Sequence, residues 1–388
     1  MKMTRIPKLD QSAESNSAGT VLGLFSGAGG LDLGFEQAGF KHLGAMDILP
    51  WAVQTMRHNR PKWHVDEADV RDYTPSVTEE VDVLLAGFPC QGFSLGGSRN
   101  ASDDRNTLFR EVVRLTSLLQ PKVVVIENVL NLRTMKTPWS GKPFSEEIAD
   151  AFREIGYHVT YDIFRVSGYG VPQTRRRFVF IASRHPLPEG FFFPQPAADT
   201  TIRDCLFDLG QGRGDKLPNH DPTWGFKSQV HVETHEHYDP SELVVPVRFS
   251  RTASDGHPIR SFDTPFPAVD TATIWGWAVG NVTAQRVEKN RTTDKFIRNP
   301  DSEVTLWRVS ASRLRSFTHR EYARLQTFPD DWVFLGNNKR DVHLQIGNAV
   351  PVKFAKAIAL AVVKLLNAQK LGKAYDQEGA TGRQMELV

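Results

Sequence analysis

Short apolar runs alternate with amphipathic segments through the first half of the chain. TVLGLF, HLGAMD, VDVLLAGF, KVVVIEN and RRFVFIAS are apolar at most positions, as strands buried on both faces of a sheet are. Between them, LDLGFEQAGF, LPWAVQTMRHN, NTLFREVVRLTSLL and SEEIADAFREIGYH place apolar residues at helical spacing. This alternation predicts an α/β fold, a mainly parallel sheet with helices on both faces.

The pattern changes after about Arg184. The following stretch is rich in Pro and Phe and holds the short β-prone pieces LVVPVRF and PFPAVDTATIWGW, with TIRDCLFDL as a short helix. Helical spacing returns at THREYARLQTF and at VPVKFAKAIALAVVKLLNAQ. We therefore expect a disordered arm over 1–17, a main domain over 18–185, a separate lobe over 186–309, a return segment over 310–371 that completes the main domain, and a disordered tail over 372–388.

Composition adds little to this picture. The net charge is only +2, so a nucleic-acid surface would have to come from local clusters of Lys and Arg. The two cysteines, Cys90 and Cys205, exclude a disulfide framework and favour a reducing compartment. No apolar run is long enough to cross a bilayer, and MKMTRIPKLD lacks an apolar signal core. These features predict a cytoplasmic protein with no membrane partner.

The segment FSGAGG forms a glycine-rich turn between a predicted strand and a predicted helix. Glycines in such a turn let backbone N–H groups approach a ligand closely, although the spacing differs from the dinucleotide fingerprint. The second strand ends in Asp47, about twenty residues later. Asp47 could hydrogen-bond the ribose of an adenosyl or nucleotide ligand, or it could cap the helix that starts near Pro50.

Chemically competent side chains follow other predicted strands. Cys90 opens a Gly- and Ser-rich loop directly after a buried strand, a position typical of a reactive thiol rather than a structural one. Glu127 ends the next apolar strand, where a carboxylate needs a ligand, a cap or an ion-pair partner. Strand alternation would send Arg175 and Arg177 to one face and Arg176 to the other.

Six segments together resemble the DNA (cytosine-5) methyltransferases in order and approximate spacing: FSGAGGLDLGFEQAGF, GFPCQGFS, ENV, GVPQTRRR, REYARLQTFPDDW and QIGNAVP. The resemblance covers roughly residues 20–184 and 310–365 and leaves the middle lobe unmatched. It implies a Rossmann-like sheet that binds S-adenosyl-L-methionine, with a smaller, irregular target-recognition lobe over 186–309.

The resemblance also implies roles for individual residues. Cys90 is the nucleophile, Glu127 contacts N3 of the cytosine, and Arg175 and Arg177 lie near the target base. The implied cofactor residues belong to the glycine turn and to later strand ends and turns: Phe25, Gly27, Gly29, Gly30, Asp47, Ile48, Asp69, Val70, Asn348 and Val350. Gln91, Ser94 and Thr273 are implied to contact DNA.

The sequence departs from the family pattern in three places. Asp47 stands where the family usually has Glu, Ile48 replaces an aromatic residue, and Gly92 replaces a proline common in bacterial members. None of the three removes a catalytic group. The implied chemistry is thiolate addition to C6, which turns the electron-poor C5 into a carbon that can attack a methyl donor. The target cytosine must first be swung out of the duplex.

The implied partner is double-stranded DNA, together with a cognate restriction endonuclease, and we expect a bacterial monomer associated with the nucleoid. HVETHEH, with His231, His235 and His237, lacks the order of a zinc motif, so no metal is expected. A related RNA methyltransferase would carry a CFT motif in its middle lobe, which is absent. Intact PCQ, ENV and GNAVP motifs argue against a silent DNA-binding module. Without the resemblance, a nucleotide-dependent oxidoreductase would be the alternative hypothesis for the function.

Overall fold

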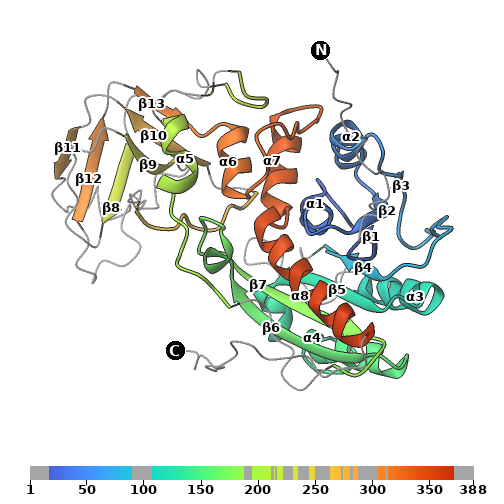
Figure 1. Cartoon of the computed structure of the whole chain (residues 1–388). Helices are drawn as coiled ribbons and strands as arrows, with labels where there is room; N and C mark the ends of the chain where they lie inside the picture. The colour runs from blue at the N-terminus through green and yellow to red at the C-terminus, as the bar shows by residue number, and fades with distance from the viewer. Residues whose placement is uncertain are drawn as a thin grey trace, which may run out of the picture.

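The computed structural model describes residues 17–89, 107–187, 195–210, 214, 216–221, 230–234, 244–249, 263–271, 274–279, 283–286, 305–310 and 313–370. Its centre is a seven-stranded sheet with the order β3-β2-β1-β4-β5-β7-β6 (Figure 1). The strands are β1 (Thr20–Leu24), β2 (Lys41–Asp47), β3 (Val65–Glu67), β4 (Val83–Ala86), β5 (Val123–Val129), β6 (His158–Arg165) and β7 (Arg176–Ser183).

The sheet is parallel over its first five strands and antiparallel at one end. β1 pairs in parallel with β2 and β4, and β4 pairs in parallel with β5. β7 runs antiparallel to both β5 and β6. The α/β prediction is thus confirmed, and the β7 direction has a consequence for the site. Because β7 is reversed, it begins at the edge where β5 ends.

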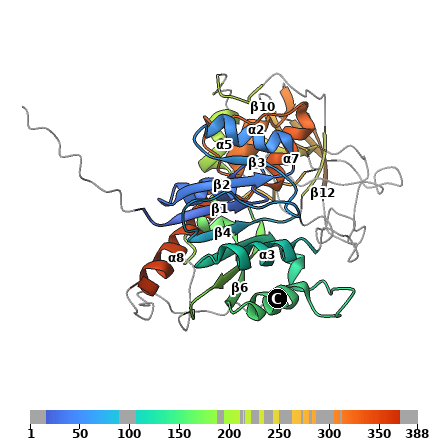
Figure 2. The ribbon, with the colours of Figure 1, turned by 90° about the vertical axis from the view of Figure 1, so that its right-hand side faces the viewer.

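Alternate residues of the strands face two separate apolar cores. Helices α3 (Phe109–Leu119) and α4 (Phe144–Glu154) cover one face of the sheet, with Leu84 and Ile126 among the strand residues beneath them. Helices α1 (Gly30–Glu36) and α8 (Val352–Lys370) cover the other face, over Val83 and Val125. Figure 2 shows the strands with α3 on one side of the sheet and α8 on the other. Burying both faces explains why the strands are apolar at consecutive positions.

A smaller lobe lies beside this sheet (left in Figure 1). It contains α5 (Arg203–Gly210) and two three-stranded sheets, β13-β10-β9 and β11-β12-β8. The strands are β8 (Val230–Thr234), β9 (Val244–Phe249), β10 (Ile274–Val279), β11 (Thr283–Arg286), β12 (Thr305–Ser310) and β13 (Arg313–Ser316), all paired antiparallel. β13 pairs with β10 of the lobe, although it lies after residue 309, where the lobe was predicted to end. The domain boundaries stay predictions.

The return segment connects the lobe to the main domain through α6 (His319–Leu325) and α7 (Lys339–Asn348). Glu321 of α6 is fully buried and forms an ion pair of 2.7 Å with Arg315 of β13, while the indole N–H of Trp277 in β10 donates to it. The Glu321 side chain also accepts a hydrogen bond from the Thr318 backbone, which completes a capping box. The Glu321 carboxylate therefore caps the N-terminus of α6 and binds side chains of two lobe strands, β10 and β13.

Candidate active site

The carboxyl edge of the parallel strands gathers most of the described site residues. The glycine turn follows β1, Asp47 ends β2, Phe88 follows β4, and Glu127 lies near the end of β5. Arg177, near the start of the reversed β7, pairs with Val129 at the same edge. Ligands of open α/β sheets bind at this edge.

Glu127 and Arg177 form the centre of the site. Nε of Arg177 lies 2.6 Å from Oε1 of Glu127, and both side chains are mostly buried. The contact is an ion pair in which Oε1 has no aligned hydrogen bond. Burial raises the pKa of Glu127, and the charge of Arg177 opposes this shift. Glu127 therefore keeps a proton to higher pH than an exposed carboxyl group, so it can serve as a hydrogen-bond donor.

Two contacts hold the chain just before the predicted nucleophile. Nδ2 of Asn128 donates to the Phe88 carbonyl at 3.2 Å, and the Phe88 ring packs edge-on against Phe25 with centroids 6.5 Å apart. The segment that leads into the PCQ motif is thus tied both to β5 and to the glycine turn. Cys90, Gln91, Ser94 and Thr273 lie outside the described residues, and their roles stay predictions.

The glycines of the turn serve three different purposes. Gly29 caps the start of α1 with a φ of 81°, a left-handed conformation that favours glycine. Gly27 also has a positive φ, of 55°, and a side-chain carbon added there would meet no atom within 4 Å. A carbon added at Gly30 would lie 2.3 Å from the Val350 carbonyl oxygen. Space is therefore open above Gly27 and closed at Gly30.

Asp47 fastens the turn to the end of β2. Its Oδ2 accepts the Gly27 N–H at 2.7 Å and its Oδ1 accepts the Leu49 N–H at 2.9 Å. Helix α2 (Pro50–Asn59) has Leu49 at its cap position with no side-chain cap, so the helix-capping alternative for Asp47 is wrong. Burial raises the pKa of Asp47, against the effect of these backbone hydrogen bonds.

The surroundings of the turn fit an adenosyl group. Ile48 is 58% exposed beside Asp47, and Ser26 in the turn has a buried hydroxyl without a partner. An exposed apolar side chain, an orphaned hydroxyl and open space above Gly27 are what an adenine and a ribose would fill. Asp69 accepts from the Arg71 backbone and side chain, whereas Val70 is buried.

The other predicted cofactor residues come from the return segment. Asn348 is exposed at the end of α7, and Val350 approaches the turn through its carbonyl contact with Gly30. The sheet edge and the return segment therefore meet at the glycine turn.

Arg175 lies apart from the Glu127–Arg177 pair. Its guanidinium is buried, and Nη1 donates to the carbonyls of Val269 at 2.8 Å and Gly347 at 3.1 Å. Arg176, the next residue, is exposed. Of the two outer arginines, Arg177 is thus the one that contacts Glu127, while Arg175 joins the lobe to the GNAVP segment.

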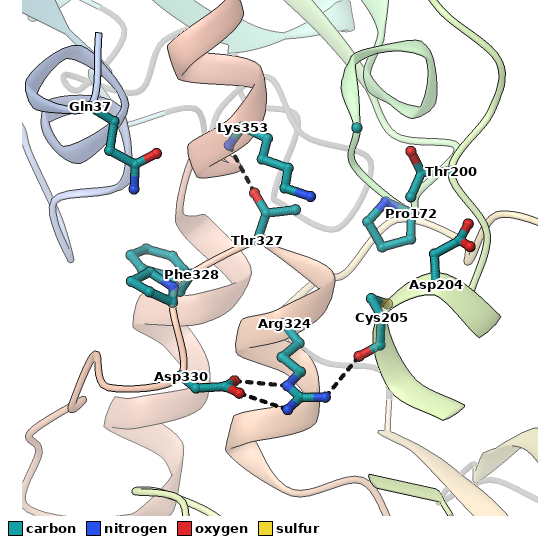
Figure 3. A pocket seen from close by; sticks show the side chains of 12 residues that line it. Gln37, Pro172, Thr200, Asp204, Cys205, Arg324, Thr327, Phe328, Asp330 and Lys353 are labelled. Carbon is teal, nitrogen blue, oxygen red and sulfur yellow. Dashed lines mark hydrogen bonds and ion pairs between the residues drawn. The ribbon is translucent and has the colours of Figure 1, made fainter. Parts of the chain in front are cut away.

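A cavity of about 450 Å³ is lined by none of the predicted site residues (Figure 3). Arg324 occupies one wall and forms ion pairs of 2.7 Å with Asp330 and Asp208. Cys205 also lines the cavity, and burial raises the pKa of its thiol well above the ordinary value. Cys205 is therefore a poor nucleophile at neutral pH.

The sequence model of the C-5 cytosine-specific DNA methylases matches residues 19–364. The chain belongs to this family. The methylase is 32% identical to the type II methyltransferase M.Eco47II of Escherichia coli over 376 residues, which cover 92% of this chain and 82% of the relative. The family acts on carbon 5 of cytosine in DNA, and S-adenosylmethionine is its methyl donor.

Solved structures agree with this assignment. A protein encoded within an E. coli prophage and assigned as a DNA modification methyltransferase superposes with a TM-score of 0.57 at 25% identity, over 90% of this methylase and 99% of that chain. The S. pombe Dnmt2 methyltransferase superposes with a TM-score of 0.55 at 18% identity, over 90% and 99% of the two chains, which shows a shared fold.

Two further findings concern other classes of site. Among the described residues, no helix is long and apolar enough to span a membrane. The same part of the chain holds no group of three or more His, Cys, Asp and Glu residues arranged for a metal ion. His235 and His237 of the HVETHEH segment lie outside it.

The structure also reveals polar residues that the sequence did not single out for a role. Asn128 positions Phe88, and the buried amides of Gln173 and Gln326 hydrogen-bond each other. All three belong to recognisable motifs, ENV, PQTRRR and LQTFP, but the sequence does not show the hydrogen-bond partners of these side chains.

Proposed function

We propose that this methylase works through a covalent bond between the Cys90 sulfur and C6 of a cytosine swung out of duplex DNA. The observation that carries the proposal is the buried Glu127, paired with Arg177 at the edge where the chain leads from Phe88 towards Cys90. A carboxyl group with a raised pKa at that edge is suited to protonating the ring that a thiolate attacks.

Two proton transfers at Glu127 precede and follow the methylation of C5 in the proposed reaction. The Cys90 thiolate adds its electron pair to C6, the C5–C6 double bond opens, and N3 takes the proton of Glu127, so that C5 becomes an enamine carbon. Bound S-adenosylmethionine would supply the methyl group to C5, with its S–CH3 bond broken and S-adenosylhomocysteine left behind. Loss of the C5 proton to a base then expels the thiolate and restores the double bond, and N3 returns its proton to Glu127. Arg177 stabilises the Glu127 carboxylate that exists between the two proton transfers.

Residues of the glycine turn are proposed to hold the cofactor. The Asp47 carboxylate would face the ribose, Ile48 the adenine, and the backbone at Gly27 the rest of the molecule. Phe25, Gly29, Gly30, Asp69, Val70, Asn348 and Val350 complete the proposed cofactor set. Arg175 supports the site by joining the lobe to the GNAVP segment.

The test uses duplex DNA with 5-fluorocytosine at the target, because fluorine at C5 cannot leave as a proton does. With cofactor present, a denaturant-stable protein–DNA band is expected. Cys90→Ser should abolish the band, and Cys205→Ser, the matched control at the only other cysteine, should retain it. A band that persists in Cys90→Ser, or an adduct mapped to Cys205 by mass spectrometry, contradicts the proposal.

Glu127→Gln tests the proton donor in the same experiment. The amide cannot protonate N3, so adduct formation should slow at least 100-fold while DNA binding is kept, in line with about 10²–10⁴-fold for general acid catalysis. In the wild type, the adduct rate attributable to Glu127 should fall as pH rises through its raised pKa, because the proton is then lost. The variant should lack this decline. An identical pH profile in both proteins would refute the acid role.

The biological setting is proposed from the relatives. M.Eco47II and M.NgoMIV are both named type II methyltransferases, so we infer a cognate endonuclease that cuts the same unmethylated site. We also propose that the lobe over 186–309 recognises the target and that the protein acts as a monomer at the nucleoid. Light scattering checks the mass in solution, and resistance of the methylated host DNA to the endonuclease checks the pairing.

A further inference from the structure

A buried polar chain connects the small lobe to the glycine turn. Its first member, Gln173, is fully buried just before β7. Its Oε1 accepts the Val269 N–H at 2.9 Å, and its Nε2 donates to Oε1 of Gln326 at 2.9 Å and to the Leu325 carbonyl at 2.5 Å. One amide thus holds a lobe segment on one side and the end of α6 on the other.

Gln326 continues the chain towards the cofactor residues. It is also fully buried, and its Nε2 donates to the carbonyls of Ile346 at 2.6 Å and Ala349 at 3.1 Å. These two carbonyls bracket Gly347 and Asn348, and the next residue, Val350, contacts Gly30 of the turn. The Gln326 amide therefore fixes the loop formed by the end of α7 and residues 349–350, which contacts the glycine turn.

A second connection runs in parallel with the first. Nη1 of Arg175 donates to both Val269 and Gly347, so one nitrogen bridges the lobe segment and the loop. The backbones approach closely as well, because a side-chain carbon added at Gly347 would lie 2.8 Å from the Asp270 carbonyl oxygen. A shift of the Val269–Asp270 segment cannot leave the loop unchanged.

The lobe end of this chain comes shortly before the predicted DNA contact in the sequence. Val269 is four residues before Thr273 and five before the start of β10, whose backbone N–H at Trp275 donates to the Tyr322 hydroxyl at 2.7 Å. DNA bound to the lobe would therefore displace the Val269–Asp270 segment, which Gln173 and Arg175 hold. A buried amide with every group paired has one favoured arrangement and passes such a displacement on.

We propose that Gln326 is a positioning residue that couples DNA binding at the lobe to cofactor binding at the glycine turn. The inference rests on the proposed placement of these two ligands. In energetic terms, DNA raises cofactor affinity by a factor, and the cofactor raises DNA affinity by the same factor. Loss of the Gln326 amide reduces that factor without removing any group that touches either ligand.

The experiment measures S-adenosylhomocysteine binding by calorimetry, with and without a duplex that carries the methylated site found by bisulfite sequencing. Typical couplings predict about 5–150-fold tighter binding with DNA in the wild type. In Gln326→Met, which keeps the side-chain length and removes the amide, the factor should fall to within about twofold of unity. The affinity for each ligand alone should stay within about threefold of wild type.

Thr327→Val is the matched control. Its hydroxyl accepts the Lys353 N–H at the start of α8 and has no described contact with the lobe, so the variant loses one neighbouring hydrogen bond of a different kind. It should retain the full coupling factor. Gln173→Met, which breaks the chain at its other end, should lose the factor as Gln326→Met does and replaces that variant if it does not fold.

The outcomes separate this inference from the proposed function. A wild type without coupling, an unchanged factor in Gln326→Met, or loss of the factor in Thr327→Val would overturn the positioning role. Loss of both ligand affinities in both glutamine variants would show a merely structural network and would also overturn it. The proposed function fails differently, through a wild type that forms no Cys90 adduct or binds no S-adenosylhomocysteine.

Discussion

Gly34→Ala sets two opposing effects against each other at the contact between α1 and α8. Alanine is favoured over glycine inside a helix by about 1 kcal/mol, so propensity alone predicts a more stable protein. A side-chain carbon at Gly34, however, would lie 2.3 Å from the Ala355 Cβ and 2.7 Å from the Lys356 backbone nitrogen. Ordinary contacts between such atoms are about 3.5–4.0 Å, so the helices would have to separate by more than 1 Å.

The clash is expected to outweigh the gain in helix propensity, so that Gly34→Ala lowers the stability of the protein. Overpacking costs about 1–3 kcal/mol, and the upper end applies because Lys356 contributes a backbone atom that cannot rotate away. After the gain of about 1 kcal/mol from helix propensity, we expect a net loss of about 2 kcal/mol, a roughly 30-fold shift in the unfolding equilibrium. Cofactor affinity should fall as well, since α1 starts at the glycine turn and α8 follows the Val350 loop.

Urea unfolding of the cofactor-free protein measures the effect as a lower midpoint at an unchanged slope. Ala355→Gly removes one of the clashing atoms, so the loss in the Gly34→Ala/Ala355→Gly double variant should be smaller than the sum of the losses in the two single variants. A coupling free energy of about 1 kcal/mol is expected. A Gly34→Ala protein as stable as the wild type, or more stable, would refute the reasoning, because helix propensity would then outweigh the packing between α1 and α8.

Two further predictions concern the cofactor and the target. Asp47→Ala removes a carboxylate that receives two backbone N–H groups, and S-adenosylhomocysteine should bind at least about tenfold more weakly while DNA binding is kept. Unchanged affinity by calorimetry would rule out this cofactor assignment. Grafting residues 186–309 onto a relative with a known site should transfer the sequence that is methylated. A folded chimera that still marks its host's site would contradict the lobe assignment.

Strands buried on both faces could be predicted from the sequence, whereas an exposed edge strand and a polar helix could not. The five apolar runs became β1, β2, β4, β5 and β7 because their apolar residues are buried on both faces of the sheet. β6 was missed, since HVTYDIFR lies at the sheet edge with only Phe164 buried. Helix α7 was also missed, because its Asn338 cap precedes a largely polar helix.

The candidate site divides along a similar line. Asp47 and Glu127 lie at one edge of the sheet, and the sequence showed this because each residue lies at or near the carboxyl end of an apolar strand. The partner of each side chain is a tertiary property. Asp47 was equally consistent with a helix cap, and α2 has no side-chain cap bond, which excludes that role. The pairing of Arg177, rather than Arg175, with Glu127 required the register of β7 against β5.

The reversed direction of β7 explains why the short motif over residues 173–177 contacts both Glu127 and the lobe. In an all-parallel sheet, the residues before β7 would lie at the opposite edge from Glu127. Because β7 is antiparallel, its first residues reach the carboxyl edge, where Arg177 meets Glu127. The preceding residues, Gln173 and Arg175, then fall between the lobe and the return segment and pair with groups up to 172 residues away. A local motif of five residues thus joins Glu127, the lobe and the end of α7.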